Sequence, residues 1–332
     1  MMAPMAKTAL LGTGAYAALR KLRPSRQAAI LRYHAICSPD ACAYASPGIC
    51  ISPEAFERHV QYLANNYSVL PLADVVGRLR ERRRLPKNCV AITFDDGYAD
   101  NLPAARLLAR YGLTATFFIA AGCLAGGEPF WPAEIRELVQ ALTQSPIRLS
   151  VPGTEITLEV GGPAQRVDAT GRITKLFKSV PIPAREALRA QLREAAGQPA
   201  LPECMLRWDE LEEMAGLGMT IGAHTLTHPN LPSAGLADAT AEIRGSKALL
   251  EERLGRPVTL FSYPNGGAEE YYTPDLQAAV RDAGFEASAT SRNGFTGEST
   301  DLYALERVQV AERLEDLVFA LEVERFAFVP TA

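Results

Sequence analysis

Seven short apolar segments alternate along the chain with stretches of helical periodicity, and this alternation restricts the possible folds more than any other feature. Each segment has six or seven residues, the usual length of a buried strand, and together they cover residues 28–34, 88–94, 114–120, 219–224, 258–264, 285–290 and 305–310. Strands that alternate with helices favour a parallel sheet. The chain also lacks the glycine-rich nucleotide-binding patterns that would favour an open sheet. We therefore expect an α/β barrel of about seven parallel strands.

Residues 52–66 form the clearest of the predicted helices. Ser52 is a suitable N-cap, and a proline follows it at the first helical position. Apolar residues recur on one side of this helix at helical spacing, which predicts that this side faces the strands. His59 lies on the polar side, so we expect it to be exposed to solvent.

Residues from about 121 to 206 interrupt the alternation. They contain two Gly-Gly pairs and several prolines, with helical patterns only near 133–143 and 184–196. We interpret this stretch as a helical insertion on the barrel and not as a second catalytic domain. Residues 1–27 contain a short amphipathic pattern and are predicted to form an N-terminal helical segment, which leaves residues 28–332 for the barrel.

Polar side chains follow several of the predicted strands at the points where the strands end. Asp95 and Asp96 follow one strand, His34 and His224 end two others, and a glycine-rich turn at residues 263–267 follows a fourth. In a (β/α) barrel the carboxyl ends of all strands meet at one face, where active sites are built. We therefore expect these residues to share one site.

His224 and His228 are spaced as two metal ligands would be. Because Pro229 disfavours a helix at His228, a loop that curls around an ion is the expected geometry. Two imidazoles and one carboxylate make a site for a first-row metal ion with open positions for water. One of Asp95 and Asp96 can then bind the ion while the other acts as a base.

The motifs in this order resemble those of the polysaccharide deacetylases, the NodB-like enzymes of carbohydrate esterase family 4. The resemblance runs from about residue 28 to about residue 310 and is closest to the branch with an early Tyr-His motif. The matching segments are RYH (32–34), TFDDG (93–97), ATFFI (115–119), HTLTH (224–228) and FSYPNGG (261–267). The resemblance implies a distorted (β/α) barrel that hydrolyses the N-acetyl amide of an amino sugar in a polysaccharide or glycoconjugate and releases acetate.

The resemblance also implies a role for each site residue. Asp96, His224 and His228 would hold one divalent ion, with Zn²⁺ expected and Co²⁺, Ni²⁺ or Mn²⁺ as alternatives. Asp95 would be the general base, and the backbone amide of Asn265 would stabilise the oxyanion.

The chain departs from the family pattern in two places. The family's third motif usually begins with an arginine that braces the catalytic aspartate, but Ser262 stands at that position and only Arg307 is a candidate substitute. Many members also carry a late histidine that acts as general acid, and no histidine follows His228 here. His34 is the replacement that we predict, with a pKa raised by a neighbouring carboxylate.

Composition restricts the kinds of ligand and the cellular locations that we expect for this protein. The net charge of −4 argues against a nucleic-acid ligand, and no segment reaches the ~18 apolar residues of a membrane span. An N-acetylated glycan or glycolipid is the expected partner. We predict a protein that is cytoplasmic or peripheral to the membrane, with membrane contact through residues 1–27 and export by a signal peptide left open. Cys37, Cys42 and Cys50 share one loop, and a disulfide among them is left open too.

Other activities fit parts of the pattern. A deformylase, or another C–N hydrolase acting on a lipid-linked amino sugar, would use the same residues. A non-catalytic carbohydrate-binding relative should have lost the metal ligands, which are present. A ferrous oxygenase shares two histidines and a carboxylate, but its fold context differs from the barrel predicted here.

Overall fold

The computed structural model describes residues 2–266 and 271–326. Seven parallel strands close into a ring in the order β1, β10, β9, β8, β7, β4, β3 and again β1, as predicted. Each predicted segment overlaps one of these strands, and β9 extends three residues beyond the predicted segment 285–290. Their bounds are β1 Ala28–Tyr33, β3 Cys89–Phe94, β4 Thr116–Ile119, β7 Thr220–Ala223, β8 Leu260–Ser262, β9 Ala287–Asn293 and β10 Leu305–Gln309.

Residues on alternate faces of the strands form two separate cores. Apolar residues from the inner faces, such as Ile30, Ala91 and Phe118, fill the barrel interior. Residues of the opposite parity, such as Ile92, pack outward against the helices. Helix α4 (Leu72–Arg80) contributes to the interior cluster and so closes the barrel at the starts of the strands. The opposite end remains for the site.

Helices connect and surround the strands. A short strand, β2, pairs in parallel with the first residues of β3. The bounds of these elements are β2 Ser68–Val69, α3 Pro53–Asn66, α5 Asn101–Arg110, α9 Trp208–Gly216, α10 Leu231–Ala234, α11 Leu236–Leu254, α12 Pro274–Asp282 and α13 Leu314–Glu322. Three short 3₁₀ turns complete them, η1 Pro47–Ile49, η2 Ala121–Cys123 and η3 Glu324–Phe326. Ser52 caps α3 as predicted, since its side chain accepts a hydrogen bond from the Ala55 amide at 3.3 Å.

The predicted exposure of His59 is wrong. Its side chain is fully buried, and its Nδ1 lies 3.2 Å from the hydroxyl of Tyr33. Tyr33 ends β1 and points outward into the layer between strands and helices. The Tyr33 hydroxyl supplies the polar partner that a buried imidazole needs. Because His59 is buried as well, the buried side of α3 includes a polar residue next to its apolar ones.

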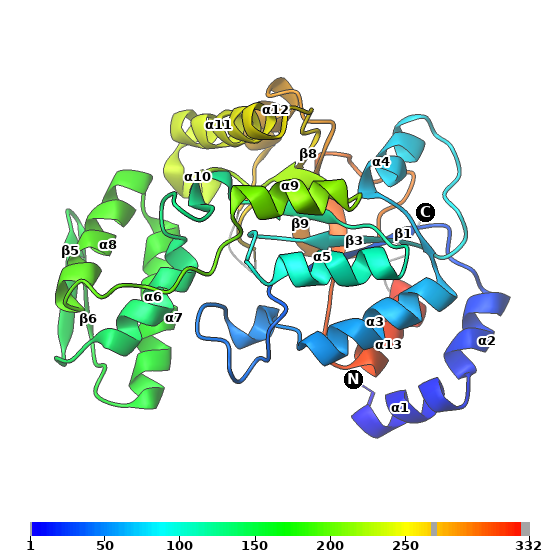
Figure 1. The fold of residues 1–332 in the computed structure, drawn as a ribbon, viewed down its shortest axis with the longest axis horizontal. Coiled ribbons are helices and arrows are strands. Elements are labelled where there is room, and N and C mark those ends of the chain that lie inside the picture. Colours follow the sequence, from blue (N-terminus) through cyan, green and yellow to red (C-terminus); the bar gives the residue numbers. More distant parts are fainter. Residues whose placement is uncertain (1, 267–270, 327–332) are drawn as a thin grey trace.

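The stretch between β4 and β7 carries a separate group of elements at one side of the barrel (Figure 1). It has a hydrophobic core of its own, built around Trp131, Phe177 and Leu188. Helices α6 and α8 overlap the two predicted helical patterns, whereas α7 and an antiparallel hairpin were not predicted. The bounds are α6 Trp131–Ala141, β5 Ile147–Val151, β6 Thr154–Leu158, α7 Pro163–Ser179 and α8 Ile182–Ala195.

Two N-terminal helices, α1 (Pro4–Gly12) and α2 (Ala15–Leu22), pack beside α13 near the end of the described chain (Figure 1). Arg20 of α2 is buried and pairs with Glu322 of α13 at 2.9 Å. Across residues 2–266 and 271–326, the helices are all too short or too polar to cross a bilayer.

Candidate active site

The inward-facing rows of the strands change from apolar to polar as they approach the open end of the barrel. On β3 the row runs from Ala91 through Thr93 to Asp95, and on β10 it runs from Leu305 to Arg307. Because successive residues of a strand alternate between faces, this parity aims each polar side chain at the barrel axis. The sequence pattern thereby builds a polar rim on an apolar barrel.

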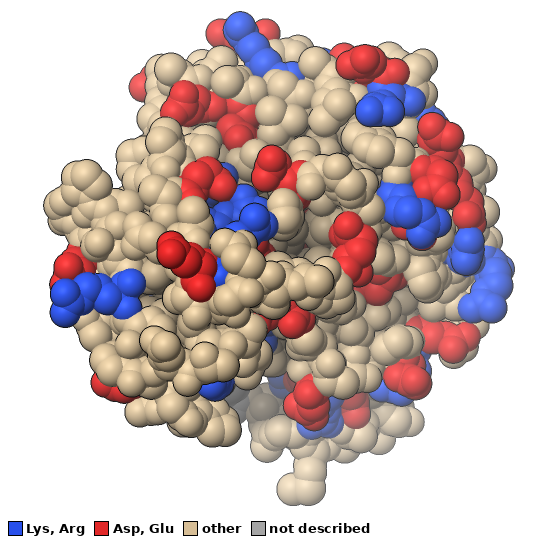
Figure 2. Space-filling model, turned by 60° about the vertical axis from the view of Figure 1, so that its left-hand side comes forward, with Lys and Arg blue, Asp and Glu red and all other residues tan. Residues whose placement is uncertain are grey.

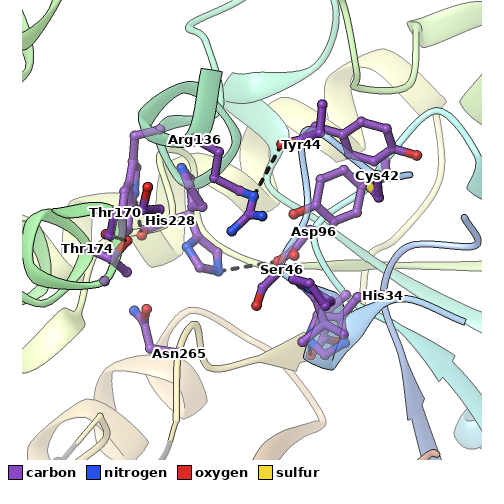
Figure 3. Close-up of a pocket in the computed structure, with 18 of the residues that line it drawn as sticks. His34, Cys42, Tyr44, Ser46, Asp96, Arg136, Thr170, Thr174, His228 and Asn265 are labelled. Atoms are coloured by element: carbon purple, nitrogen blue, oxygen red, sulfur yellow. Dashed lines mark hydrogen bonds and ion pairs between the residues drawn. The ribbon is translucent and has the colours of Figure 1, made fainter. Parts of the chain in front are cut away.

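A cleft of about 1000 Å³ lies over this rim. The barrel forms its floor, the loop after β1 forms one wall, and helices α6 and α7 form the other. In Figure 3, His34, Asp96 and His228 face the cavity from the barrel, while Thr170 and Thr174 of α7 border it from the insertion. Figure 2 shows acidic and basic side chains interspersed over one face of the molecule, without an extended basic patch there.

Asp96, His224 and His228 converge at the centre of the cleft floor. The Nε2 atoms of the two histidines lie 3.5 and 3.3 Å from Oδ1 of Asp96, and all three side chains are buried. Two ligand atoms that bind one zinc ion at about 2.1 Å lie about 3.4 Å apart in a tetrahedral site. The two distances to Asp96 match this value, and all three ligand atoms lie within 4.8 Å of one another, so the three residues fit a single divalent ion.

Backbone conformation contributes to this convergence. Asp96, Thr225, His228 and Asn265 all adopt left-handed φ angles of 79°, 68°, 55° and 71°, which are uncommon for residues other than glycine. Such conformations cost of order 1–3 kcal/mol each and persist where the surrounding structure enforces them. At Asp96 the reversal turns the chain directly after Asp95, so two neighbouring carboxylates reach different partners.

The orientation of His224 is set by its second ring nitrogen. Nδ1 donates a hydrogen bond to the carbonyl oxygen of Ser262 at 2.7 Å, which leaves Nε2 as the nitrogen that faces Asp96. Metal-binding histidines commonly have such an outer partner. By contrast, Nδ1 of His228 is buried and has no hydrogen-bond partner among the residues that the structure describes.

Glu242 of α11 holds the loop that joins His224 and His228. Its carboxylate accepts hydrogen bonds from the backbone amides of Leu226 and Thr227, both at 2.8 Å, and from the Thr227 hydroxyl at 2.6 Å. Sequence analysis did not identify Glu242, because a glutamate within a helix carries no local sign of a tertiary partner.

Two residues of the insertion also hydrogen-bond to this loop. The indole Nε1 of Trp131 donates to the backbone carbonyl of His228 at 3.0 Å, and Arg185 donates to the Thr227 carbonyl at 3.3 Å and hydroxyl at 3.0 Å. Neither Trp131 nor Arg185 was predicted as a site residue. The insertion is therefore attached to the loop that carries two of the three candidate metal ligands.

Arg307, the candidate substitute for the missing motif arginine, contacts Asp95 directly. Its guanidinium donates two hydrogen bonds to the carboxylate of Asp95, each at 2.7 Å, and a third to the Ser262 hydroxyl at 3.1 Å. Burial by itself would raise the pKa of Asp95, but the charge and the hydrogen bonds of Arg307 outweigh it and hold the pKa well below its usual range. Asp95 is consequently ionised throughout the neutral range.

His34 lies beside Asp95 at the edge of the cleft, with its Nε2 3.8 Å from Oδ2 of that residue. The expected rise in its pKa is wrong. Burial lowers the pKa of His34 to about 4 and outweighs the opposing charges of Asp96 and Asp95. The imidazole is therefore neutral at neutral pH before any reaction. It must first accept a proton before it can act as a general acid.

Asn265 also borders the cleft, close to His228. Its side-chain amide donates to the carbonyl of Pro229 at 3.1 Å, while its Oδ1 is buried without a partner in the described parts of the chain. This contact ties the turn after β8 to the loop that carries His228, so Asn265 belongs to the same group of residues.

Comparison with known proteins agrees with this arrangement. The family model described as polysaccharide deacetylase matches residues 82–145 and 156–288. A Bacillus subtilis (strain 168) protein named as a polysaccharide deacetylase, YxkH, is 23% identical over 297 residues, which cover 89% of this chain and 75% of that protein.

Several solved structures are similar to this one, including the following two. The Streptococcus pyogenes deacetylase PplD, solved in complex with acetate, superposes with a TM-score of 0.60 at 20% identity, over 90% of this chain and 99% of that one. IcaB from Ammonifex degensii gives a TM-score of 0.58 at 18% identity, over 90% and 97% of the two chains. At these identities the likeness concerns the fold.

Proposed function

The chain belongs to the polysaccharide deacetylase family, and on that premise we propose that it is a metal-dependent carbohydrate N-deacetylase. It removes the N-acetyl group from an amino sugar in a polysaccharide or glycoconjugate and releases acetate. The observation that carries this proposal is the buried group of Asp96, His224 and His228, with ligand atoms 3.3 and 3.5 Å apart, directly beside the carboxylate of Asp95.

We assign the three buried residues to the metal and propose zinc as the ion. Nitrogen and oxygen donors in this number suit zinc and leave positions open. When bound there, the ion polarises the amide carbonyl and makes a water molecule more acidic. The contact of His224 with the Ser262 carbonyl and the contact of Glu242 with the histidine loop support this role, because both fix donor atoms in place.

Asp95 acts as the general base in this proposal. Its carboxylate is ionised and pinned by Arg307, so it can accept the proton of the attacking water without changing position. His34, 3.8 Å away, is neutral before the reaction. It can take that proton from Asp95 and deliver it to the leaving nitrogen, and its low pKa makes it a strong acid once it is protonated.

The remaining groups bind and orient the substrate. The backbone N–H of Asn265 is proposed to stabilise the negative charge that develops on the amide oxygen. We also propose that residues 1–27 form a helical segment distinct from the barrel of residues 28–332, and that the insertion at about 121–206 supplies the distal wall of the glycan site. Thr170 and Thr174 on that wall offer hydroxyl groups that suit a sugar ligand.

Acetate release from a panel of N-acetylated glycans and glycolipids tests the proposal. The panel includes N-formyl counterparts, and each reaction is run before and after metal removal by a chelator and again after zinc is restored. We expect acetate release that the chelator abolishes and zinc restores, and no release by an Asp96→Asn variant. Release of formate alone, or acetate release that survives complete metal removal, would overturn it.

A further inference from the structure

Three thiol groups gather beside the cleft, in the loop that follows β1. The sulfur atoms of Cys37, Cys42 and Cys50 all lie within 4.8 Å of one another, and the Cys37 thiol donates to the Cys50 sulfur at 3.3 Å. All six cysteines of the chain are free thiols in the described structure, so the disulfide left open from the sequence does not occur here. The proposed deacetylation makes no use of this group.

The fold brings the thiols together from both ends of the loop. Cys50 pairs with Ala35 where the chain returns to the barrel, and the Ile51 amide donates to the Ala35 carbonyl at 3.0 Å. Between them the loop folds back on itself, so that the Cys42 amide donates to the Ser38 carbonyl at 3.1 Å. The three sulfurs are thus positioned by backbone contacts on separate parts of the loop.

We propose that Cys37, Cys42 and Cys50 form a second metal site, which binds a thiophilic ion, Zn²⁺ or Cu⁺, through three sulfur ligands. Sulfurs that bind one ion at about 2.3 Å lie about 3.8 to 4.0 Å apart. The sulfurs of Cys37 and Cys50 lie 3.3 Å apart and the other two distances are below 4.8 Å, so binding requires only small side-chain shifts.

The donor set defines the class of ion. Thiolates select soft or borderline ions such as Cu⁺ and Zn²⁺, whereas Mg²⁺, Ca²⁺ and Mn²⁺ prefer oxygen ligands. The Asp96, His224 and His228 group offers nitrogen and oxygen only. The two sites therefore differ in their donor atoms, and each can be observed spectroscopically in the presence of the other.

Ion binding at this cluster is coupled to proton release. Thiols bind a metal ion as thiolates, so an incoming ion takes the place of the thiol protons, which are released to solvent. Cys42 borders the cleft and gives the ion a route of entry.

Cobalt(II) is a suitable probe because thiolate ligation produces a strong charge-transfer absorption that nitrogen and oxygen ligands do not produce. Protein that has been reduced, freed of metal and kept without oxygen is titrated with Co²⁺. We expect the band in the wild type and in Asp96→Asn, in which the candidate catalytic site is impaired. We expect it to be lost in Cys42→Ser and in Cys37→Ser.

Cys204→Ser is the matched control, since Cys204 packs in the same apolar cluster but is not among the three grouped sulfurs. It should keep the band. Competition by Zn²⁺ and, in a separate arm, by Cu⁺ then shows which ion the site prefers. The proposal is overturned if the fully reduced wild type gives no thiolate band. It is overturned equally if peptide mapping of protein purified in air without added reductant shows a Cys37–Cys50 disulfide, because oxygen has then oxidised two of the three sulfurs and they are no longer free to bind an ion.

Discussion

At the scale of single residues, the adjacent carboxylates of Asp95 and Asp96 illustrate how neighbours assign different roles. Asp95 continues the inward row of β3 and meets the guanidinium of Arg307. Asp96 has a φ of 79°, which turns its side chain toward His224 and His228 instead. The base and the metal ligand can therefore be consecutive in sequence.

The matched pair Asp95→Asn and Asp96→Asn separates these roles. Asp95→Asn keeps all three proposed ligands, so it should retain metal and lose about 10²–10⁴-fold in kcat, the usual effect of removing a general base. Asp96→Asn should lose metal and activity together. Elemental analysis and acetate release on both variants provide the measurement. If Asp95→Asn loses its metal as readily as Asp96→Asn, the assignment of the pair is wrong.

Arg307 should control the acidic limb of the pH–rate profile. Asp95 must be ionised to act, so activity falls as the pH falls through its pKa, which Arg307 keeps low. In Arg307→Gln the guanidinium charge no longer opposes the effect of burial, so the pKa of Asp95 rises. The loss of kcat/KM should then begin at a higher pH than in the wild type, while Arg307→Lys should shift it less because the charge remains.

The control for Arg307 is Arg313→Gln, whose side chain is 44% exposed and whose partner is Glu315, on α13. Its profile should match the wild type. Because removal of one partner from a buried ion pair costs about 3–5 kcal/mol of stability, thermal unfolding is recorded for every variant. An acidic limb at the same pH in folded Arg307→Gln would contradict the prediction.

His34 is predicted to matter only when the leaving group needs a proton. An amine leaves poorly without one, whereas the phenolate of 4-nitrophenyl acetate leaves unaided. His34→Ala should therefore slow amide hydrolysis by about 10²-fold and change ester hydrolysis little. The backbone of His34 keeps its contact with Asn101 in this variant, since that hydrogen bond uses the His34 carbonyl. Equal losses on both substrates, at unchanged metal content, would indicate a structural role.

At the scale of secondary structure elements, strands could be predicted well because burial on both faces leaves a continuous apolar run. All seven segments overlap a strand, and the grouping of polar residues at the ends of β1, β3 and β7 followed from the rule that barrel strands end at one face. The contact of Arg307 with Asp95 was harder to predict, since 212 positions separate the residues. Trp131 and Arg185 escaped prediction for the same reason.

The insertion is therefore predicted to support the metal site as well as to border the cleft. Trp131→Phe keeps an aromatic ring but removes the N–H that donates to the His228 carbonyl. We expect about tenfold weaker metal binding, the lower end of the range for outer partners of metal ligands. Trp208→Phe on α9, the other tryptophan of the chain, is the control. Chelator competition measures both affinities, and equal values would remove Trp131 from this role.

At the scale of the whole molecule, the two ends of the described chain meet on the outside of the barrel. Strand β1 closes the ring against both β3 and β10, so the barrel is complete only when residues from near both ends are in place. Helix α2 precedes β1 directly and lies beside α13, which follows β10. We infer that the contact between these helices stabilises ring closure.

Arg20 of α2 tests that inference, because its buried guanidinium bonds Glu322 at 2.9 Å and Asn66 at 2.6 Å. Arg20→Ala should lower the free energy of unfolding by about 3 kcal/mol, the lower end of the range for a broken buried ion pair, since Arg325 still faces Glu322 at 3.2 Å. Lys7→Ala breaks the more exposed pair with Asp316 and should cost less than about 1 kcal/mol. Urea unfolding measures both free energies.

Activity per folded molecule should not change in Arg20→Ala, because α2 contributes no residue to the described lining of the cleft. Equal stabilities in the two variants would mean that docking of α2 contributes little to the closed ring.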